Sequence, residues 1–268
     1  MKEYSIISWN VNGLRAVSKK KVFQEKNFFE WWKTVNPDIF CLQETKAHPQ
    51  QVTKKLSKPE TYHSFWNSGE RKGYSGVLTY SQEEPISIHY DLGVESFDIE
   101  GRLIATEFPH FVLFNVYFPN GKKNDERLKY KLDFYDKFLE TIDNLRDEGK
   151  SIVFCGDVNT AHNPIDLARP KANETISGFL PIERAWMDKV IKHGYVDTFR
   201  HFHPDEPDHY TWWTYRSPGA RERNVGWRLD YFFVSKDILD AVKEADIFSE
   251  VKGSDHCPVG LTLQFKDS

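Results

Sequence analysis

Cysteine is scarce in this sequence, and the wide spacing of the cysteines argues against a disulfide-stabilised protein and against a cysteine-rich zinc protein. The 268 residues contain three cysteines, Cys41, Cys155 and Cys257, which are far apart and form no C-x-x-C pair. A disulfide framework and a cysteine-rich zinc cage are therefore not expected. Widely spaced single cysteines are typical of buried thiols in a reducing compartment. We expect a cytoplasmic protein, associated with the nucleoid if the source is a prokaryote.

Long apolar runs are also absent. No uninterrupted apolar stretch approaches the roughly 18 residues that a membrane span requires. The first residues, Met1 to Tyr4, lead into a strand-like segment without the apolar stretch of about 7–15 residues found in secretory signals. A membrane is therefore not expected among the partners of this chain.

The sequence has no Pro/Gly/Ser-rich linker, no low-complexity tract and no convincing repeat. Apolar residues make up 39% of the chain and aromatic residues 15%, which is enough large apolar surface for a substantial core. We therefore expect one domain that covers residues 1–268, with a monomer as the expected state.

Excess charge is small, since the formal net charge is −4. Domains that bind nucleic acids are often basic overall, so the sum argues weakly against such a partner. Lysines and arginines nevertheless cluster in the ranges 19–21, 122–131 and 216–228. Most charge runs are solvated faces, but this distribution leaves a nucleic-acid partner open.

What is present is a series of short β-branched or aromatic runs that alternate with segments of helical period. Strands are predicted at residues 4–13, 38–45, 74–81, 111–121, 151–160, 228–235 and 257–265. Helices are predicted at residues 23–35, 125–149 and 181–194. Several strands are apolar on successive residues, which indicates a sheet covered on both faces. The pattern predicts an α/β fold with helices layered over sheets.

Polar side chains recur at the ends of the predicted strands. They are Asn10, Asn12, Glu44, Tyr117, Asn120, Asp157, Asn159, Asp230, Asp255 and His256. Each one alone is more often a turn former than a functional group. Glu44, Asp157 and Asp230 follow apolar runs directly, so they belong where a rigid sheet meets a loop. If the strands share a direction, four carboxylates and one imidazole converge at one edge.

Such a cluster of carboxylates would need a cation or a shared proton, because like charges a few Å apart repel strongly. The candidate ligands are oxygen donors, which favours Mg²⁺ or Mn²⁺ over Zn²⁺. Mg²⁺ keeps several waters and commonly binds phosphate groups of a substrate. A phosphate ester is therefore the expected substrate class.

Several motifs also carry a family resemblance. "SWNVNGLRA", "CLQETK", "NVYFPNG", "CGDVNTAH", "NVGWRLDYFFVS" and "GSDHCPV" occur in this order. Together, over about residues 4–265, they resemble the exonuclease III family of AP endonucleases, within the endonuclease/exonuclease/phosphatase superfamily. The resemblance implies a four-layered α/β sandwich, in which two packed mixed sheets are flanked by helices. It also implies Mg²⁺-dependent cleavage of the phosphodiester 5′ to an abasic site in duplex DNA, together with 3′→5′ exonuclease and 3′-phosphodiesterase activity.

The resemblance assigns roles to the polar residues at the strand ends. Glu44 is similar to the principal metal carboxylate of the family, with Asn12 and Asp255 nearby. His256 and Asp230 resemble a His–Asp pair in which the acid fixes the ring and the imidazole stabilises the anionic phosphorane.

A second group of residues is expected around the attacking water and the phosphate. Asp157 resembles the residue that activates or orients the water, with Asn159 beside it. Tyr117 and Asn10 resemble polar contacts to the reacting phosphate. Whether Asp157 or a metal-bound hydroxide is the base is left open by the resemblance.

The stretch from residue 211 to residue 230 resembles the part of the family that recognises DNA. Trp212, Trp227 and Leu229 match the walls of a small apolar pocket for a flipped-out baseless sugar. Trp213 is more simply read as a core residue. Arg216 matches a residue inserted into the DNA. The residues expected to contact DNA phosphates are Asn120, Lys122, Lys123, Asn173, Arg221 and Arg223.

Three departures from the family pattern leave alternatives open. Asn12 replaces an Asp found in some relatives, Ile176 stands where many carry Asn, and Trp212 is bulkier than the Phe of some members. Asn12 bears on metal affinity and Ile176 on one phosphate contact. The bulk of Trp212 bears on the pocket, so incision at deoxyuridine or other altered nucleotides stays open. Two further alternatives are a phosphoesterase of the same superfamily that acts on inositol phosphates or lipids, and a non-catalytic DNA-binding relative.

Overall fold

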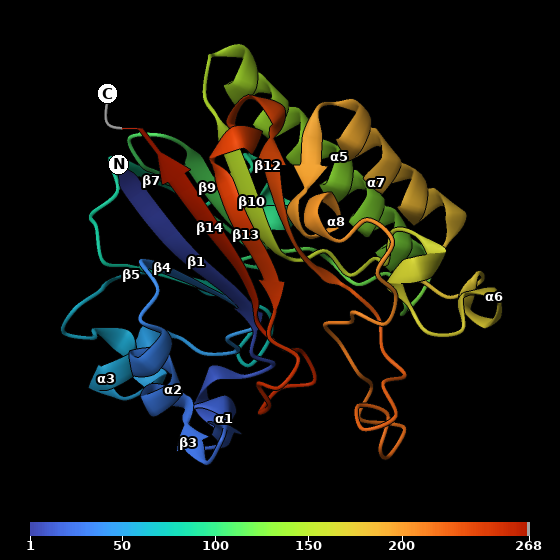
Figure 1. Ribbon diagram of the computed structural model, residues 1–268, viewed down its shortest axis with the longest axis horizontal. Helices are drawn as coiled ribbons and strands as arrows, with labels where there is room; N and C mark the ends of the chain where they lie inside the picture. Colours follow the sequence, from blue (N-terminus) through green and yellow to red (C-terminus); the bar gives the residue numbers. More distant parts are fainter. Residues whose placement is uncertain (267–268) are drawn as a thin grey trace.

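The computed structural model describes residues 1–266, in which two six-stranded β-sheets pack face to face between layers of helix (Figure 1). The first sheet contains β1 (Lys2–Asn10), β4 (Ile39–Gln43), β5 (His63–Asn67), β6 (Val77–Ser81), β13 (Val242–Ile247) and β14 (Val259–Phe265). The second sheet contains β7 (Ser87–His89), β8 (Leu103–Glu107), β9 (Val112–Tyr117), β10 (Ile152–Asp157), β11 (Tyr195–Asp197) and β12 (Asp230–Ser235). A small ribbon is formed by β2 (Lys21–Phe23) and β3 (Lys26–Asn27).

Both sheets have the same pattern of strand directions. The strand orders are β13-β14-β1-β4-β6-β5 and β11-β12-β10-β9-β8-β7. In each sheet the two central strands are parallel, and every other neighbouring pair is antiparallel. The central pairs also end level, because Asn10 is paired with Gln43 and Asp157 with Tyr117. Their carboxyl ends therefore present polar residues at one edge of each sheet.

The site-bearing strands do not all share one direction, so the condition stated for convergence is not met. β12 runs antiparallel to β10 and begins at Asp230, opposite Asp157. β14 runs antiparallel to β1, with Val259 opposite Ser8, so Asp255 and His256 precede that strand. Asp230 therefore opens a strand instead of following one. The mixed sheets bring strand ends and strand beginnings to the same edge.

The helices cover the outer faces of the two sheets (Figure 1). The α-helices are α1 (Leu14–Val17), α2 (Phe28–Val35), α3 (Lys54–Ser57), α4 (Glu95–Asp98), α5 (Asp125–Asp147), α6 (Pro170–Asn173), α7 (Pro181–Lys192) and α8 (Thr198–Phe202). The 3₁₀ turns are η1 (Pro49–Gln51), η2 (Pro164–Asp166) and η3 (Lys236–Ala241). α2 packs on the first sheet, and α5 and α7 pack on the second. Between the sheets, Ile6, Cys41, Val153 and Cys155 belong to one shared apolar layer. The expected four-layered sandwich is confirmed.

Two of the three predicted helices are found close to their expected bounds. α5 begins at Asp125, but its cap is Asn124, whose side chain accepts a hydrogen bond from the Arg127 backbone. α7 begins at Pro181 and is followed by Gly194 in a left-handed conformation. These ends follow the usual preferences for Pro at the start of a helix and Gly after its end.

The third predicted helix, at residues 23–35, starts too early. Gln24 and Glu25 have positive φ angles of 42° and 65°, which form the turn between β2 and β3. The helix begins only at Phe28, where Asn27 and Glu30 form a capping box. The residues before Phe28 fit the apolar spacing of a helix, but they belong to the β2–β3 ribbon. The turn between these two strands prevents the helix from starting earlier.

The predicted strands are found, although the strand expected at residues 74–81 begins at Val77 because Ser75 and Gly76 have left-handed φ angles. β5, β7, β8, β11 and β13 were not predicted. Apart from β8 these lie at sheet edges, and β7 and β11 have only three residues each. Such short segments carry too little periodicity to be recognised.

Cys41, Cys155 and Cys257 are buried free thiols, as predicted. Within residues 1–266 there is no helix with both the length and the apolar character needed to cross a membrane.

Candidate active site

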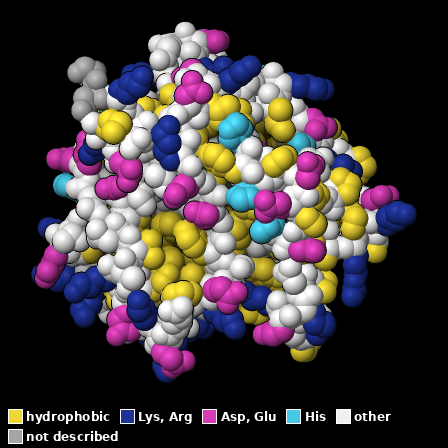
Figure 2. Space-filling model, viewed as in Figure 1, with side chains coloured by type: hydrophobic (Ala, Val, Ile, Leu, Met, Phe, Trp, Pro, Cys, Tyr) yellow, Lys and Arg dark blue, Asp and Glu magenta, His cyan; other side chains and the backbone are white. Residues whose placement is uncertain are grey.

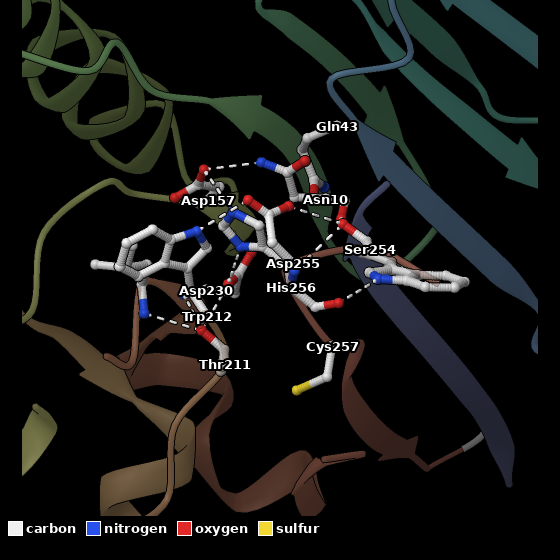
Figure 3. A network of polar contacts seen from close by, with 12 residues as sticks. Asn10, Gln43, Asp157, Thr211, Trp212, Asp230, Ser254, Asp255, His256 and Cys257 are labelled. Atoms are coloured by element: carbon white, nitrogen blue, oxygen red, sulfur yellow. Dashed lines mark hydrogen bonds and ion pairs between the residues drawn. The ribbon is translucent and has the colours of Figure 1, made fainter. Parts of the chain in front are cut away.

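The polar residues of both sheets meet at the edge where β1, β4, β9 and β10 end. The first link between the sheets is Asn10, the last residue of β1. Its Nδ2 donates hydrogen bonds to Glu44 Oε1 and to Asp157 Oδ2, both at 2.9 Å. Figure 3 shows the bond to Asp157. Asn10 is fully buried, so its bond to Asp157 is shielded from water, while its bond to Glu44 is partly buried. The amide therefore fixes two carboxylates from different sheets beside each other.

Glu44 follows β4 in a left-handed backbone conformation, with φ of 50°. Such a conformation is uncommon for a residue with a side chain and is enriched at functional sites. Its Oε2 lies 2.9 Å from the ammonium of Lys46, which also donates to Asn12 Oδ1. Burial alone would raise the pKa of Glu44, but the Lys46 charge and the Asn10 hydrogen bond outweigh it and hold the pKa below its usual value. Glu44 is thus an ionised carboxylate near neutral pH.

Asp157 ends β10 and is 1% exposed. Its Oδ1 accepts from the backbone N–H of Asn159 at 2.8 Å, and its Oδ2 accepts from Asn159 Nδ2 at 3.2 Å. Burial raises its pKa to about 7, the positive charge of His256 opposes this rise, and repulsion from Asp230 and Glu44 adds to it. Asp157 therefore exchanges a proton near neutral pH more readily than an ordinary aspartate.

His256 is bound to Asp230 on the opposite side. His256 Nδ1 lies 2.8 Å from Asp230 Oδ2, and the same oxygen accepts a hydrogen bond from Thr211 Oγ1 at 2.6 Å (Figure 3). Thr211 Oγ1 in turn accepts from the backbone N–H groups of Leu229 and Asp230. The hydroxyl fixes the carboxylate, and the carboxylate fixes the ring.

The imidazole is directed toward Asp157 with its other nitrogen. His256 Nε2 lies 3.8 Å from Asp157 Oδ2. Burial lowers the pKa of His256, but Asp230 and Asp157 more than offset this and raise it to about 10. His256 is therefore cationic at neutral pH, with Nε2–H available to a negatively charged group in the site.

The loop before β14 is tied to the segment that begins at Thr211. Asp255 Oδ1 accepts from Asn12 Nδ2 at 2.9 Å. Asp255 Oδ2 accepts from Trp212 Nε1 at 3.1 Å (Figure 3). Ser254 Oγ donates to the backbone carbonyl of Asn10 at 2.8 Å. The loop thereby joins the end of β1 to the aromatic segment.

Within residues 1–266, Glu44, Asp157 and His256 bring potential ligand atoms close together. One atom from each lies within 4.8 Å of the other two. His256 is cationic and both of its ring nitrogens carry protons, so the two carboxylates are the groups available to a metal ion. The predicted metal set was Glu44, Asn12 and Asp255, so the two sets share only Glu44. Asp255 is bonded to Asn12 and Trp212 instead, and the roles of Asn12 and Asp255 as ligands stay predictions.

The donor set fits a hard cation. Carboxylate oxygens dominate, and no cysteine belongs to the cluster. The Lys46 ammonium already bridges Glu44 and Asn12, so this position favours positive charge.

Tyr117 and Asn120 lie beside the carboxylates. Tyr117 is 9% exposed, and the Arg102 guanidinium lies over its ring, 4.7 Å from the centroid. Burial and the charge of Glu44 raise the pKa of the Tyr117 hydroxyl well above its usual value, so it remains a donor. Asn120 Nδ2 donates to Asn159 Oδ1 at 2.9 Å. Contact of Tyr117 and Asn120 with a phosphate group stays a prediction.

An apolar wall adjoins the polar cluster. Trp227 and Leu229 are buried in a cluster with Leu167 and Phe179, and the half-buried Trp212 packs against it. The rings of Trp212 and Trp227 are perpendicular, with centroids 6.3 Å apart. The Lys122 ammonium lies over both rings, at 5.0 and 5.5 Å from their centroids. Trp213 is 4% exposed, in agreement with its reading as a core residue.

The predicted DNA-contacting residues differ in how free their side chains are. Lys123, Arg216 and Arg223 are exposed, and Arg223 bonds only within its own loop, to Ser217 and Pro218. Asn173 Nδ2 donates to backbone carbonyls of residues 168 and 169.

Arg221 departs most from its predicted role. Its guanidinium donates to the backbone carbonyls of Ser249, Val251 and Ser254, and it lies 4.4 Å from the centroid of the Trp213 ring. A contact with a DNA phosphate would require these bonds to be exchanged. In this geometry Arg221 fixes the loop that carries Asp255 and His256.

Sequence reasoning missed three residues of the site: Lys46, Thr211 and Ser254. Lys46 had a usable signal, because it follows Glu44 by two residues and a cation beside an isolated carboxylate is expected. Thr211 and Ser254 had none, since single hydroxyl residues are common in loops.

Comparison with known proteins identifies relatives over nearly the whole chain. Residues 7–256 match the model of the Endonuclease/Exonuclease/phosphatase family. The exodeoxyribonuclease of Bacillus subtilis is 45% identical over 258 residues, which cover 96% of this chain and 98% of that protein. The DNA repair nuclease APEX1 of Danio rerio is 42% identical over 260 residues, 96% of this chain and 81% of that protein. Among solved structures, an AP endonuclease from Archaeoglobus fulgidus superposes with a TM-score of 0.86 at 29% identity, covering 98% of this chain and all of the other.

Proposed function

The chain belongs to the endonuclease/exonuclease/phosphatase family, and we propose that it is a DNA-repair nuclease of the exodeoxyribonuclease and AP endonuclease type. Its substrate is duplex DNA with an abasic or otherwise damaged site, and the bond cleaved is the phosphodiester 5′ to that site. The same centre removes nucleotides or blocking groups from 3′ ends. We further propose that residues 1–268 act as one domain.

One observation carries this proposal. Asn10 joins Glu44 to Asp157 by hydrogen bonds, and the hydrogen-bonded His256–Asp230 pair lies against them, with His256 Nε2 3.8 Å from Asp157 Oδ2. Trp212 of the apolar wall reaches the same region through its hydrogen bond to Asp255. A general phosphatase has no need of the aromatic wall, and a non-catalytic DNA-binding relative has no need of a buried His–Asp pair. An enzyme that hydrolyses a phosphodiester next to a baseless sugar requires both.

Asp157 orients the attacking water and accepts its proton, for which a pKa near neutrality is suited. The water oxygen forms a bond to phosphorus, the bond from phosphorus to the 3′-oxygen breaks, and the departing oxygen takes a proton from solvent. The products are a 3′-hydroxyl and a 5′-phosphate on the baseless sugar. Asn159 and Asn10 hold the Asp157 carboxylate, and Tyr117 contacts the phosphate.

His256 stabilises the negative charge that develops on the phosphate oxygens. Its Nε2–H is the donor, and Asp230 keeps the ring both oriented and charged. Thr211 maintains this arrangement through its hydrogen bond to Asp230. The pair is thus positioned before substrate binds, so little reorganisation accompanies the reaction.

Mg²⁺, for which Mn²⁺ can substitute, supplies a Lewis acid to the phosphate when it is bound. Glu44 is proposed as its principal carboxylate, with Asp157 within reach and Asn12 and Asp255 as neighbours. Lys46 balances the charge of Glu44 in its absence.

Trp212, Trp227 and Leu229 form the walls of the pocket for the baseless sugar, which a nucleotide with its base would overfill. Entry of a sugar requires Lys122 to leave the two rings, and the ammonium is then free to meet a phosphate. Arg216 is inserted into the duplex, while Lys123, Arg223, Asn120 and Asn173 contact phosphates without sequence preference.

The test is incubation of the purified protein with a duplex that carries one tetrahydrofuran abasic analogue. We expect a nick 5′ to the analogue with Mg²⁺ and none with EDTA. Undamaged duplex, a duplex with one deoxyuridine and a duplex with a recessed 3′ end measure the other activities in the same assay. If none of these duplexes were cleaved in the presence of Mg²⁺, the proposal would be refuted.

A further inference from the structure

A surface hollow that is not lined by any residue of the active site lies between α2, α3 and the chain that leads into β5. Its volume is about 660 Å³. Phe29, Trp32 and Tyr62 form an apolar floor, and Pro59 completes one side. None of its lining residues contributes to the polar cluster or to the aromatic wall. A ligand in this hollow would therefore leave the active site open.

The rim of the hollow is strongly basic. Lys33, Lys54, Lys55 and Lys58 line it, against the single acid Glu60. Within residues 1–266 no carboxylate lies within ion-pair distance of these four ammonium groups. Elsewhere in the chain many lysines are paired, and the formal net charge of the protein is −4. Figure 2 shows Lys and Arg side chains at the lower left, in the region that α2 and α3 occupy in Figure 1.

The floor favours insertion of a side chain over stacking of a nucleobase. Trp32 and Tyr62 are only 6% and 9% exposed. The Trp32 ring is covered by Tyr62 and Tyr80, with centroids 5.1 and 4.6 Å away. Lys55 lies over the ring of Phe29, 5.9 Å from its centroid. Single-stranded nucleic acids bind to aromatic rings with open faces, and these rings are largely covered.

We propose that this hollow binds an acidic peptide segment of another protein, one that carries a bulky apolar side chain. The apolar side chain lies against the floor formed by Phe29, Trp32 and Tyr62, and neighbouring carboxylates pair with the lysines of the rim. Apolar anchors in pockets supply most of the affinity of such contacts, while rim charges mainly set the association rate and the choice of partner. The site gives this nuclease a place of attachment and does not depend on the proposed function.

Binding is measured by fluorescence anisotropy with a labelled Asp-Glu-Asp-Phe-Glu-Asp peptide and the full chain. A peptide with Ser in place of Phe and a peptide with Lys in place of the acids are the two ligand controls. We expect the first peptide to bind, with affinity that falls as salt is raised. Each control peptide should bind at least about tenfold more weakly.

Two protein variants locate the site. Lys54→Glu/Lys58→Glu changes the rim, and we expect it to weaken binding by about tenfold or more. Lys236→Glu/Lys243→Glu makes the same change in net charge at exposed lysines outside the hollow and should leave affinity unchanged. All four positions are exposed, so both variants are expected to fold, and their melting temperatures check this.

Equal loss of binding in both variants would show attraction to net charge alone and overturn the proposal. Equal binding of the Phe and Ser peptides would show that no apolar side chain is bound, and this result would also overturn the proposal. A single-stranded oligonucleotide that binds more tightly than the acidic peptide, with loss in the Lys54→Glu/Lys58→Glu variant only, would assign the hollow to nucleic acid instead.

Discussion

The two sheets of this protein are built alike and behave differently at the edge where they meet. Equivalent central strands end in Asn10 and in Asp157, and the equivalent antiparallel neighbours supply His256 and Asp230. No internal repeat is evident in the sequence, so the similarity lies in strand order and direction. The same topology thus delivers polar groups twice to one place.

The difference between the two contributions is electrostatic. In the first sheet the Glu44 side chain is 16% exposed and paired with Lys46, and its pKa lies below the usual value. In the second sheet Asp157 is buried beside Asp230, and the pKa of Asp157 is raised. The negative charge of Glu44 is balanced by Lys46, two residues along the chain. The negative charge of Asp157 is balanced by His256, which comes from a distant part of the chain.

This contrast suggests a division of roles. A carboxylate that stays ionised suits the holding of a cation, while a carboxylate with a raised pKa suits proton transfer. Changes at Asp157 and at the His256–Asp230 pair should therefore reduce the rate of the chemical step, and a change at Glu44 should alter the dependence on Mg²⁺.

The largest effect is expected for Asp157→Asn. The amide keeps the size of the side chain but cannot accept the proton of water, so we expect kcat on the abasic duplex to fall by about 10³-fold. Single-turnover rates with saturating enzyme measure this step. Binding of the duplex in EDTA should be little changed, and Asp136→Asn on the exposed face of α5 is the matched control. Full activity of Asp157→Asn would show that another group is the base.

The next largest effect is expected for Asp230→Asn. An amide at this position no longer favours the charged ring of His256, and we expect kcat to fall by about 10²-fold. Asp188→Asn alters a second His–Asp pair, with His162, in which Asp188 is largely exposed. This control should retain the original rate. Similar losses in both variants would mean that the effect is one of general stability, which melting temperatures would reveal.

A smaller and different effect is expected for Glu44→Gln in the first sheet. Loss of its charge should raise the Mg²⁺ concentration for half-maximal rate by about tenfold or more, with partial recovery at high Mg²⁺. Glu107→Gln removes another lysine-paired carboxylate and should leave the Mg²⁺ dependence unchanged. If Glu44→Gln lowered kcat with an unchanged Mg²⁺ dependence, the proposed division between the sheets would be wrong.

Much of the site could be predicted from the sequence because strand ends are marked by chemistry. Glu44 and Asp157 stand directly after apolar runs, and rigid strands fix such residues at a sheet edge. The fold followed from the same runs and from the family resemblance. Strand direction could not be read in this way, so the placement of Asp230 at the beginning of β12 was missed.

Contacts that side chains make between different loops could not be predicted from sequence patterns. The support of Asp230 by Thr211 and the bond from Ser254 to the Asn10 carbonyl depend on the path of loops. The hollow between α2 and α3 depends on residues that have no shared motif. In each case the information lies in three-dimensional contacts between segments with no local periodicity.

Arg221 gives the most direct choice between the role predicted from sequence and the observed geometry. Its guanidinium holds the carbonyls of Ser249, Val251 and Ser254, so Arg221→Met should loosen the loop that carries His256. We expect a fall in kcat of only about fivefold, since a slight misplacement of a catalytic group costs rate. The salt dependence of DNA binding should stay the same, because no phosphate contact is lost.

Arg223→Met is the matched variant, because Arg223 is exposed and bonds only within its own loop. For Arg223→Met, the magnitude of the slope of log K for DNA binding against log salt concentration should fall by about one, with kcat unchanged. A reduced slope in Arg221→Met instead would mean that the guanidinium exchanges its carbonyl partners for a phosphate when DNA binds. The two slopes, measured on one duplex, therefore separate an arginine that organises the site from an arginine that binds the substrate.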